Sequence, residues 1–219
     1  MEQIKETIFL EYFNKEKLNS EDCIKNYKDR KVIFKKEIDG KVYFVKKYVP
    51  YGKREKAIAF GLQRDRAKHY EYISKKLDEI GIKHVHAVYS KIKKETFFKR
   101  SSILVTEYGG IPLGELAKEY KENISLFKEF FNIFIKLCRN KIYCTDYNFG
   151  GILVNDKREL LLIDFDAYKT KIFLTKRFKK KLIEQLQKMY THNEMSDELK
   201  EFSKNEIKRV IKELNWKDI

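Results

Sequence analysis

Alternating apolar and polar residues mark the first half of the chain as β-rich. The clearest case is 31–48, where alternating apolar residues flank the pair Asp39-Gly40. Asp-Gly suits the positive φ angles of a tight turn, so this stretch is predicted to be a β-hairpin. A further strand is predicted before it, at 22–28, and two more after it, at 85–90 and 102–108.

Apolar residues spaced by three and four positions predict the helices. Residues 53–80 contain no proline and are followed by Gly81, a residue suited to ending a helix. Residues 123–140 are apolar around much of the helix circumference, which predicts a helix buried at the centre of the second half. Two amphipathic, Lys-rich helices are predicted at 174–190 and 196–215.

A glycine-bearing joint separates two halves of different character. It consists of Pro112 with Gly109, Gly110 and Gly114. Beyond the central helix, the sequence predicts an irregular stretch at 141–150 and a second hairpin, with strands 152–154 and 159–163. This order is typical of an α+β protein with two lobes, 1–108 and 109–219, which together form one compact domain.

Two aspartates flank the second hairpin. Asp146 lies in the irregular loop before it, and Asp164 follows its last apolar strand, 18 residues later. One loop and one tight hairpin occupy about this length, so both carboxylates are expected at the same end of the hairpin. One carboxylate can accept a hydroxyl proton while the other holds magnesium on the phosphates, and phosphoryl transfer requires both roles. The pair therefore indicates a phosphotransferase.

A lysine in a predicted strand completes this chemistry. Strand alternation puts Lys46 on one face and Lys47 on the other, and either can reach the α- and β-phosphates of a nucleotide; we favour Lys46. Such a lysine needs a carboxylate partner, and Glu71 lies beside the apolar stripe of the predicted helix. Glu55 and Glu79 are less central rivals for this role.

The last predicted strand of the first lobe runs directly into the joint. A strand that becomes a connection between lobes has backbone N–H and C=O groups that can pair with the edge of an adenine ring. Glu107 and Tyr108 are therefore predicted to contact the nucleotide. The pattern is not specific by itself, because any strand that ends in Gly-Gly looks alike.

Taken in order, Lys46, Glu71, the V-T-E-Y stretch, Asp146 and Ile163-Asp164-Phe165 resemble the protein-kinase-like superfamily over nearly the whole chain. The compact size and the stretch from Tyr43 to Ile82 are similar to the lipopolysaccharide core heptose and Kdo kinases in particular. The resemblance implies a two-lobed fold, with a small β-rich N-lobe that carries one main helix and a mostly helical C-lobe.

The same resemblance implies a kinase that uses ATP and Mg²⁺ and phosphorylates a sugar hydroxyl of the lipid-linked lipopolysaccharide core. It would make Lys46 and Glu71 the ion pair that anchors the phosphates. Asp146 would be the base or the group that orients the hydroxyl, and Asp164 the metal ligand. It also implies a cytoplasmic protein that can contact the anionic inner-membrane surface peripherally.

The sequence departs from the kinase pattern at three places. Cys144 stands where kinases of this type usually have a histidine, and Gly151 stands where they carry a metal-binding asparagine. Asn148 offers an amide two residues after Asp146 and is predicted to assist the metal, although it is not equivalent. No glycine-rich phosphate loop is present. These departures predict either catalysis with one metal or a degenerate, nucleotide-binding pseudokinase.

The net charge of +15 over 219 residues favours an anionic partner. The basic run from Lys169 to Lys181 is expected either to meet phosphates of the acceptor and the inner leaflet or to form the solvated face of a helix. A basic nucleic-acid-binding protein is the alternative from another class. No recognised binding motif supports it, and it leaves the paired aspartates unexplained, so nucleic acid is disfavoured as a partner.

Three further features bound the function. The cysteines Cys23, Cys138 and Cys144 have no metal-binding spacing and fit reduced thiols. The first 13 residues lack a long apolar core, so no signal peptide is expected, and no stretch approaches the roughly 20 apolar residues of a membrane span. A small-molecule kinase of the aminoglycoside or choline type is disfavoured because few residues follow Asp164.

Overall fold

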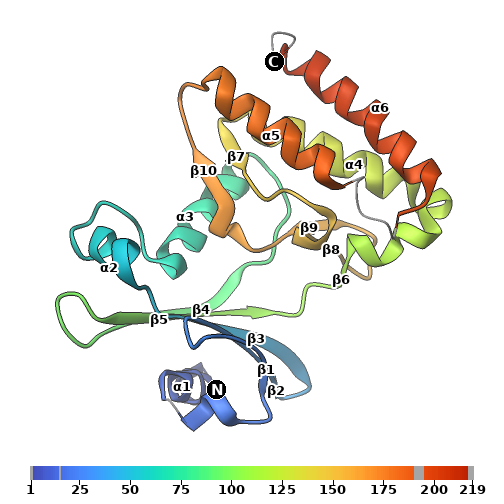
Figure 1. Cartoon of the computed structure of the whole chain (residues 1–219). Helices are drawn as coiled ribbons and strands as arrows, with labels where there is room; N and C mark the ends of the chain where they lie inside the picture. Colours follow the sequence, from blue (N-terminus) through green and yellow to red (C-terminus); the bar gives the residue numbers. More distant parts are fainter. Residues whose placement is uncertain (1, 15, 190–194, 217–219) are drawn as a thin grey trace. The chain divides into compact units, whose positions relative to one another are not determined.

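The computed structural model describes residues 2–14, 16–189 and 195–216 (Figure 1). The chain forms two compact units. Unit 1 comprises Met1–Lys75 and Val85–Tyr108, and unit 2 comprises Lys76–His84 and Gly109–Ile219. The last crossing from unit 1 to unit 2, between Tyr108 and Gly109, falls at the start of the glycine-bearing joint. Residues 76–84, expected in the first lobe, belong to unit 2, where the carbonyl of Lys83 accepts the N–H of Leu162 at 3.1 Å.

An antiparallel five-stranded sheet, in the order β1-β2-β3-β5-β4, forms the body of unit 1. Its strands are β1 (Cys23–Tyr27), β2 (Lys31–Ile38), β3 (Lys41–Tyr48), β4 (Ala87–Lys94) and β5 (Arg100–Glu107). The β2–β3 hairpin turns at Asp39 and Gly40, with φ angles of 53° and 72°. The predicted hairpin and the three other predicted strands are thus confirmed, with boundaries shifted by a few residues.

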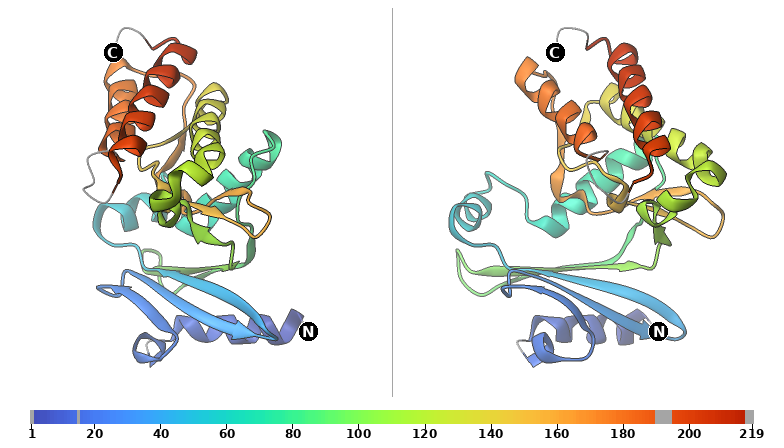
Figure 2. Two further views of the ribbon diagram at one scale, coloured as in Figure 1. Left: turned by 90° about the vertical axis from the view of Figure 1, so that its right-hand side faces the viewer. Right: turned by 45° about the vertical axis from the view of Figure 1, so that its right-hand side comes forward.

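A helical segment at the start of the chain covers one face of this sheet, and the sequence pattern predicted no element there. It consists of α1 (Glu2–Leu10), η1 (Glu11–Phe13) and η2 (Glu16–Asn19). Figures 1 and 2 show α1 lying across the sheet. The core beneath it consists of Phe9, Tyr12, Val32, Phe34, Tyr43, Val45, Ile103 and Val105. Strand alternation places the sheet residues of this core on one face.

The single helix expected over 53–80 is interrupted. In its place are α2 (Gly52–Ala59) and α3 (Arg66–Glu79). The break has a local cause, because Gly61 adopts a φ of +72°, which ends a helix. The carboxylate of Asp65 then accepts the N–H of Ala67 at 3.0 Å and begins α3. Gly81 has a φ of +60° just past α3, as its predicted role as a helix stop requires.

Unit 2 is mostly helical. Its helices are η3 (Leu113–Glu119), α4 (Tyr120–Arg139), η4 (Phe149–Gly151), η5 (Phe165–Ala167), α5 (Lys176–Met189) and α6 (Asp197–Glu213). The predicted central helix is α4, which packs against α6, and α6 also packs against α5. The helices predicted at 174–190 and 196–215 are α5 and α6, and residue 190 lies outside the described residues. No helix among the described residues is long and apolar enough to cross a membrane.

Two small sheets complete unit 2. One has the order β6-β8-β9, from β6 (Ile111–Pro112), β8 (Ile152–Val154) and β9 (Leu160–Leu162). The other pairs β7 (Ile142–Cys144) with β10 (Tyr168–Thr170). The second predicted hairpin is confirmed as β8–β9. The prediction of an irregular stretch at 141–150 was wrong for β7, because its partner strand lies far along the chain and leaves no local signal.

Candidate active site

The β7–β10 ladder brings the two predicted aspartates to one end of a small sheet. Cys144, the last residue of β7, pairs with Tyr168, the first residue of β10. The ladder continues where the N–H of Thr145 donates to the carbonyl of Ala167 at 3.2 Å. Asp146 follows β7 and Asp164 precedes β10 across η5, so both carboxylates project from the same end of the ladder.

The Cys144 thiol lies close to both carboxylates. Burial is the main cause that raises the pKa of Cys144 to about 12; the charges of Asp146 and Asp164 act in the same direction, and hydrogen bonds from the Asp146 backbone and the Tyr168 side chain act against it. A buried, neutral thiol therefore occupies the position where kinases of this type usually have a histidine. Because it carries no positive charge, it cannot offset the two carboxylates.

The carboxylate of Asp146 is held by two side-chain amides. Nδ2 of Asn148 donates to Asp146 Oδ1 at 3.3 Å and to the Asp146 carbonyl at 2.9 Å. From α5, Nε2 of Gln185 donates to the same Oδ1, also at 3.3 Å. Two donors on one oxygen restrict the orientation of the carboxylate, as a base that must meet a hydroxyl proton requires.

Asn148 was predicted to assist the metal, and its geometry gives that role no support. Its Oδ1 accepts the N–H of Gly150 at 2.9 Å and of Gly151 at 3.1 Å, which caps the start of η4. Both lone pairs of the amide oxygen are thus directed at backbone donors, and the amide nitrogen is directed at Asp146. The contacts describe a residue that positions Asp146.

Asp164 occupies a strained turn fixed by the ring that follows it. Its φ and ψ are 60° and 63°, a left-handed conformation in which aspartate is enriched among residues other than glycine. Phe165 is fully buried, with its ring centroid 5.7 Å from that of His84 and 5.2 Å from that of Tyr168. A carboxylate anchored in this way is a suitable oxygen ligand for Mg²⁺.

Gly151, which stands where related kinases carry a metal-binding asparagine, pairs with the residue that precedes Asp164. The N–H of Ile163 donates to the carbonyl of Gly151 at 3.2 Å, which extends the β8–β9 ladder towards Asp164. A Cβ atom at Gly151 would meet nothing within 4 Å, and its φ is not in the left-handed range. The position therefore has room for a Cβ atom and supplies no side-chain oxygen.

A cavity of about 330 Å³ opens next to Asp146. It is lined by residues of η3, η4 and α5, including Asn148, Gln185 and Lys188. Its volume lies at the lower end of the range usual for small-molecule sites, about 300–1,000 Å³. A lysine beside a carboxylate in such a cavity suits an acceptor that carries both a hydroxyl and a negative charge.

In unit 1, the two candidate lysines of β3 have different surroundings. Lys47 is only 5% exposed, and its Nζ donates to the carbonyls of Phe13 at 2.9 Å and Asn14 at 3.4 Å. It thus belongs to the face covered by α1. Lys46 lies on the opposite face, with Phe44, and is half-buried. Of the two, Lys46 is the one whose face is not covered by α1.

The proposed partner of Lys46 has its own contact. Glu71, in α3, accepts a short hydrogen bond from the hydroxyl of Ser90 in β4. This bond fixes the carboxylate on the sheet, and pairing with Lys46 stays a prediction. Glu79, the rival considered for that pairing, instead forms an ion pair with Lys76 at 2.6 Å.

The predicted nucleotide-base contacts need one correction. The N–H of Tyr108 donates to the carbonyl of Val42 at 3.0 Å, so this donor continues the sheet and does not face a ligand. Glu107 lies within the β3–β5 ladder, and its carboxylate is 3.4 Å from Lys41 Nζ. The ring of Tyr108 packs 6.4 Å from that of Phe44, which shares its face with Lys46. A contact with the base would therefore involve this aromatic pair.

Comparison with known proteins decides the family. The model of the lipopolysaccharide kinase (Kdo/WaaP) family matches residues 27–213, which is most of the chain. The chain belongs to this family. Its members are kinases that act on sugars of the lipopolysaccharide core, so the predicted family and the predicted kinase class are confirmed.

A solved structure agrees on the fold. The structure of WaaP in complex with acyl carrier protein is similar over 87% of this chain and 78% of that chain, with a TM-score of 0.63 and 17% sequence identity. At this identity the similarity shows the fold alone, and it confirms the predicted α+β kinase-like architecture. The comparison with curated proteins gives no significant match.

Proposed function

We propose that the chain transfers the γ-phosphate of ATP to a sugar hydroxyl of the lipopolysaccharide core. The observation that carries this proposal is the pair Asp146 and Asp164 at one end of the β7–β10 ladder, with Asp146 oriented by two amides. Phosphoryl transfer needs positioning and charge neutralisation more than covalent chemistry, and a held carboxylate beside a metal-binding carboxylate supplies both.

Each predicted residue has a separate role. Asp146 accepts the proton of the acceptor hydroxyl, whose sugar lies in the cavity of about 330 Å³ that Lys188 helps to line. Asp164 holds Mg²⁺, which neutralises the phosphate oxygens. In unit 1, Lys46, supported by Glu71, anchors the phosphates, while Phe44 and Tyr108 contact the base.

Gly151 favours a site with a single magnesium ion. The second metal position of related kinases uses an asparagine oxygen, and glycine supplies no side-chain oxygen. The competing proposal, a pseudokinase that binds nucleotide without turnover, rests on the same residue. The two differ in whether bound ATP is consumed when a core acceptor is present.

Thermal unfolding with and without Mg-ATP tests the nucleotide site. A ligand that binds only the folded state adds about 2.7 kcal/mol at a hundredfold excess over its dissociation constant. We expect Mg-ATP to raise the unfolding temperature of the natural chain and of Asp156→Ala, a control in the exposed β8–β9 turn, but not of Asp164→Ala. Equal shifts in all three proteins would refute the role of Asp164.

Turnover with core acceptors then defines the substrate. ADP release and the mass of the product are measured with acceptors that end in heptose or in Kdo. Phosphorylation that Asp146→Asn abolishes supports the kinase proposal and identifies the sugar. Mg-ATP binding without any ADP release would favour the pseudokinase.

We further propose that unit 1 contacts an anionic membrane surface through an exposed aromatic cluster. Phe60, Phe97 and Phe98 pack edge-to-face against one another, with ring centroids 5.0–6.0 Å apart. They are 63%, 60% and 42% exposed, and Leu62 next to them in sequence is 83% exposed. Apolar side chains gathered in water in this way usually mark an interaction surface.

Charge indicates which partner this surface meets. Phe97 and Phe98 form the tip of the β4–β5 hairpin between Lys94 and Lys99, and Arg100 donates to the carbonyl of Phe97 at 2.7 Å. Aromatic rings bordered by cations suit the headgroup region of an anionic leaflet, where the rings bury and the cations meet phosphate. A kinase whose acceptor is lipid-linked would gain from such a contact.

Vesicle co-sedimentation tests the contact. We expect the natural chain to sediment with vesicles containing phosphatidylglycerol, but not with pure phosphatidylcholine vesicles, and Phe97→Ser with Phe98→Ser to abolish binding. Ile124→Ser, an exposed apolar residue of α4, is the control and should leave binding intact. Retained binding in the double variant would overturn the proposal and favour the basic run of unit 2.

A further inference from the structure

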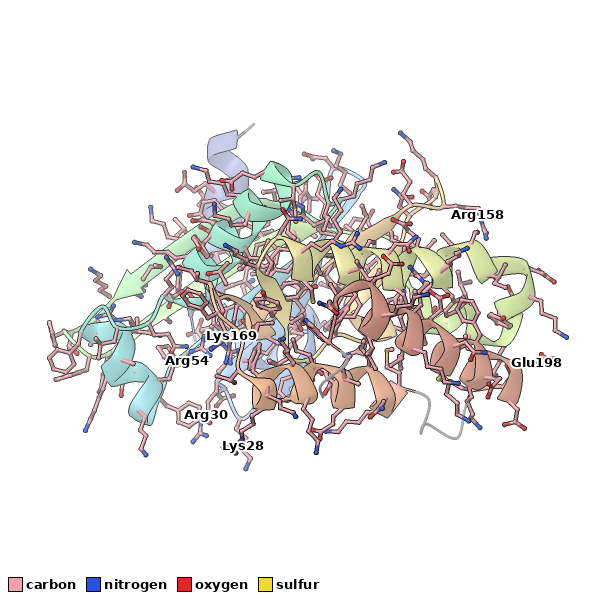
Figure 3. The ribbon with its side chains drawn as sticks, turned by 90° about the horizontal axis from the view of Figure 1, so that it is seen from above. Lys28, Arg30, Arg54, Arg158, Lys169 and Glu198 are labelled. Carbon is pink, nitrogen blue, oxygen red and sulfur yellow. The ribbon has the colours of Figure 1, made fainter. Side chains whose placement is uncertain are left out.

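A basic pocket of about 700 Å³ lies in unit 1, apart from all the residues assigned so far. It is bounded by the β1–β2 turn, the end of β3 with the loop that follows, α2 and the start of α3. Its lining includes five cationic side chains, from Lys28, Arg30, Lys31, Arg54 and Arg66. Figure 3 labels Lys28, Arg30 and Arg54, which gather there although they come from the turn and from α2.

Two of the arginines are stacked on aromatic rings. The guanidinium of Arg30 lies 3.7 Å from the ring centroid of Tyr51, and that of Arg66 lies 4.9 Å from the ring centroid of Tyr48. Stacking restricts a guanidinium group while its N–H edge stays able to bind an oxyanion. A planar guanidinium can then bind a phosphate through two parallel hydrogen bonds.

The backbone around Arg30 is also fixed. Its N–H donates to the carbonyl of Tyr27 at 3.1 Å, and its own carbonyl accepts the N–H of Val49 at 2.9 Å. Asn26 and Asp29 close the turn with two mutual hydrogen bonds of 2.7 and 2.8 Å. The pocket is therefore built on a defined turn, and its cations are not simply lysines spread over a surface.

The single carboxylate of the lining has a structural role. Asp65 is buried, and its Oδ1 accepts the N–H of Ala67 at the start of α3. Five cations therefore face one carboxylate, and that carboxylate is committed to a helix cap. This excess of positive charge favours a ligand with at least two negative charges.

The position of the pocket separates it from the proposed base site. Val42, whose carbonyl accepts the Tyr108 N–H, is near the first end of β3, and Tyr48 of the pocket is the last residue of the strand. Six residues of strand span about 20 Å. Lys46 lies between the two, two residues or about 7 Å before Tyr48, so the pocket adjoins the lysine proposed to hold the nucleotide phosphates, on the side away from the base.

We propose that the basic pocket binds a phosphate group of the acceptor sugar, held by the stacked guanidinium groups of Arg30 and Arg66. For a kinase, a bound phosphate group has two sources, the nucleotide and an acceptor that already carries a phosphate. The location beyond Lys46 favours the acceptor. The choice of acceptor rests on the proposed function, whereas the binding of a sugar phosphate does not.

Calorimetric titration of the full chain with glucose 1,6-bisphosphate tests the pocket, with glucose as the uncharged control. We expect binding of the bisphosphate alone. Arg30→Ala should weaken it by about tenfold or more, which corresponds to one lost bond between charged groups. Arg30→Lys keeps the charge but loses the planar fork, and should lose most of the affinity as well. Lys53→Ala, on the exposed part of α2 outside the pocket, should change it less than about twofold.

The same titration in saturating Mg-ATP distinguishes the two sources. Undiminished binding of the bisphosphate supports the acceptor site, and its displacement by Mg-ATP would overturn it. Absent binding, or equal binding by Arg30→Ala and Lys53→Ala, would overturn the pocket itself. Asp164→Ala should keep its affinity for the bisphosphate, although Mg-ATP no longer raises its unfolding temperature. Failure of the pocket and failure of the kinase proposal therefore give different results.

Discussion

Asn148 connects the proposed base to the loop that carries it, so its substitution affects stability and turnover separately. In Asn148→Ala, the N–H groups of Gly150 and Gly151 lose their acceptor, and Asp146 Oδ1 loses one of its two amide donors. Loss of an Asn cap typically costs about 1 kcal/mol, and Gly150 is exposed, so water replaces part of what is lost. We expect the free energy of unfolding to fall by about 1 kcal/mol.

Asn148→Asp separates the two effects. A carboxylate still accepts from both backbone N–H groups, so stability should stay within about 0.5 kcal/mol of the natural chain. It has no N–H to donate to Asp146, and it places a like charge beside that carboxylate. The lost bond to a charged group is worth about 1.5 kcal/mol or more, and we therefore expect kcat to fall about tenfold or more.

Two measurements decide the matter. Urea unfolding is followed through the fluorescence of Trp216, the single tryptophan, which is buried. Turnover is followed as ADP release with a core acceptor. Gln185→Leu is the matched control, because it removes the other donor to Asp146 without touching the η4 cap, and it should lower kcat at nearly unchanged stability. Natural turnover in Asn148→Asp would refute the positioning role, and natural stability in Asn148→Ala would refute the cap.

Other substitutions test other parts of the structure. Gly151→Asn has space for its Cβ atom and should tighten Mg²⁺ binding and raise turnover with little change in stability; unchanged magnesium dependence would sink the single-metal account. Gly110→Ala should lower the free energy of unfolding by about 3 kcal/mol in the same urea assay, because φ is +119° and the new Cβ would lie 2.0 Å from the Val154 carbonyl oxygen. Gly114→Ala is the control: its Cβ would make an ordinary 3.6 Å contact with Phe149, so its stability should be nearly unchanged. Burial raises the pKa of Cys144 to about 12 and that of Cys138 far above its usual value. Unfolded thiols titrate near pH ~8.5 and the folded ones stay protonated, so the free energy of unfolding should fall as pH rises from about 8.5 towards 12, by up to about 1.4 kcal/mol per pH unit for each thiol. The slope should be shallower in Cys144→Ala, and an equal slope would contradict the argument.

Local patterns predicted those parts of the fold whose partners are close in sequence. The β2–β3 turn at Asp39-Gly40 and the β8–β9 hairpin follow from turn chemistry and alternation. The pairing of β7 with β10 has no such signal, because the whole β8–β9 hairpin lies between Cys144 and Tyr168 in the sequence. The break between α2 and α3 was readable in principle from Gly61 and the capping residue Asp65, and the apolar stripe outweighed both.

The same division holds for the candidate site. The spacing of Asp146 and Asp164 predicted that both carboxylates lie at the same end of the β8–β9 hairpin; in the structure the two residues lie at one end of the β7–β10 ladder, which was not predicted, and their catalytic roles stay predictions. The capping role of Asn148 was accessible, since an asparagine before Gly-Gly favours a turn. Gln185 was not, because nothing distinguishes a contacting glutamine from other polar residues on an amphipathic helix. The stacked arginines of the basic pocket likewise depend on tertiary contacts.

The burial of Lys47 also determines where this chain can be shortened. The family match begins at residue 27, which invites a truncated protein that starts there. Such a protein would lack α1 and η1, would expose the apolar face of β2 and β3, and would leave the Lys47 ammonium without the Phe13 and Asn14 carbonyls that accept its hydrogen bonds. For this chain, the boundary of family similarity is therefore not a folding boundary. Any shortened version of the protein made for expression, fusion or crystallisation should therefore retain the first 26 residues.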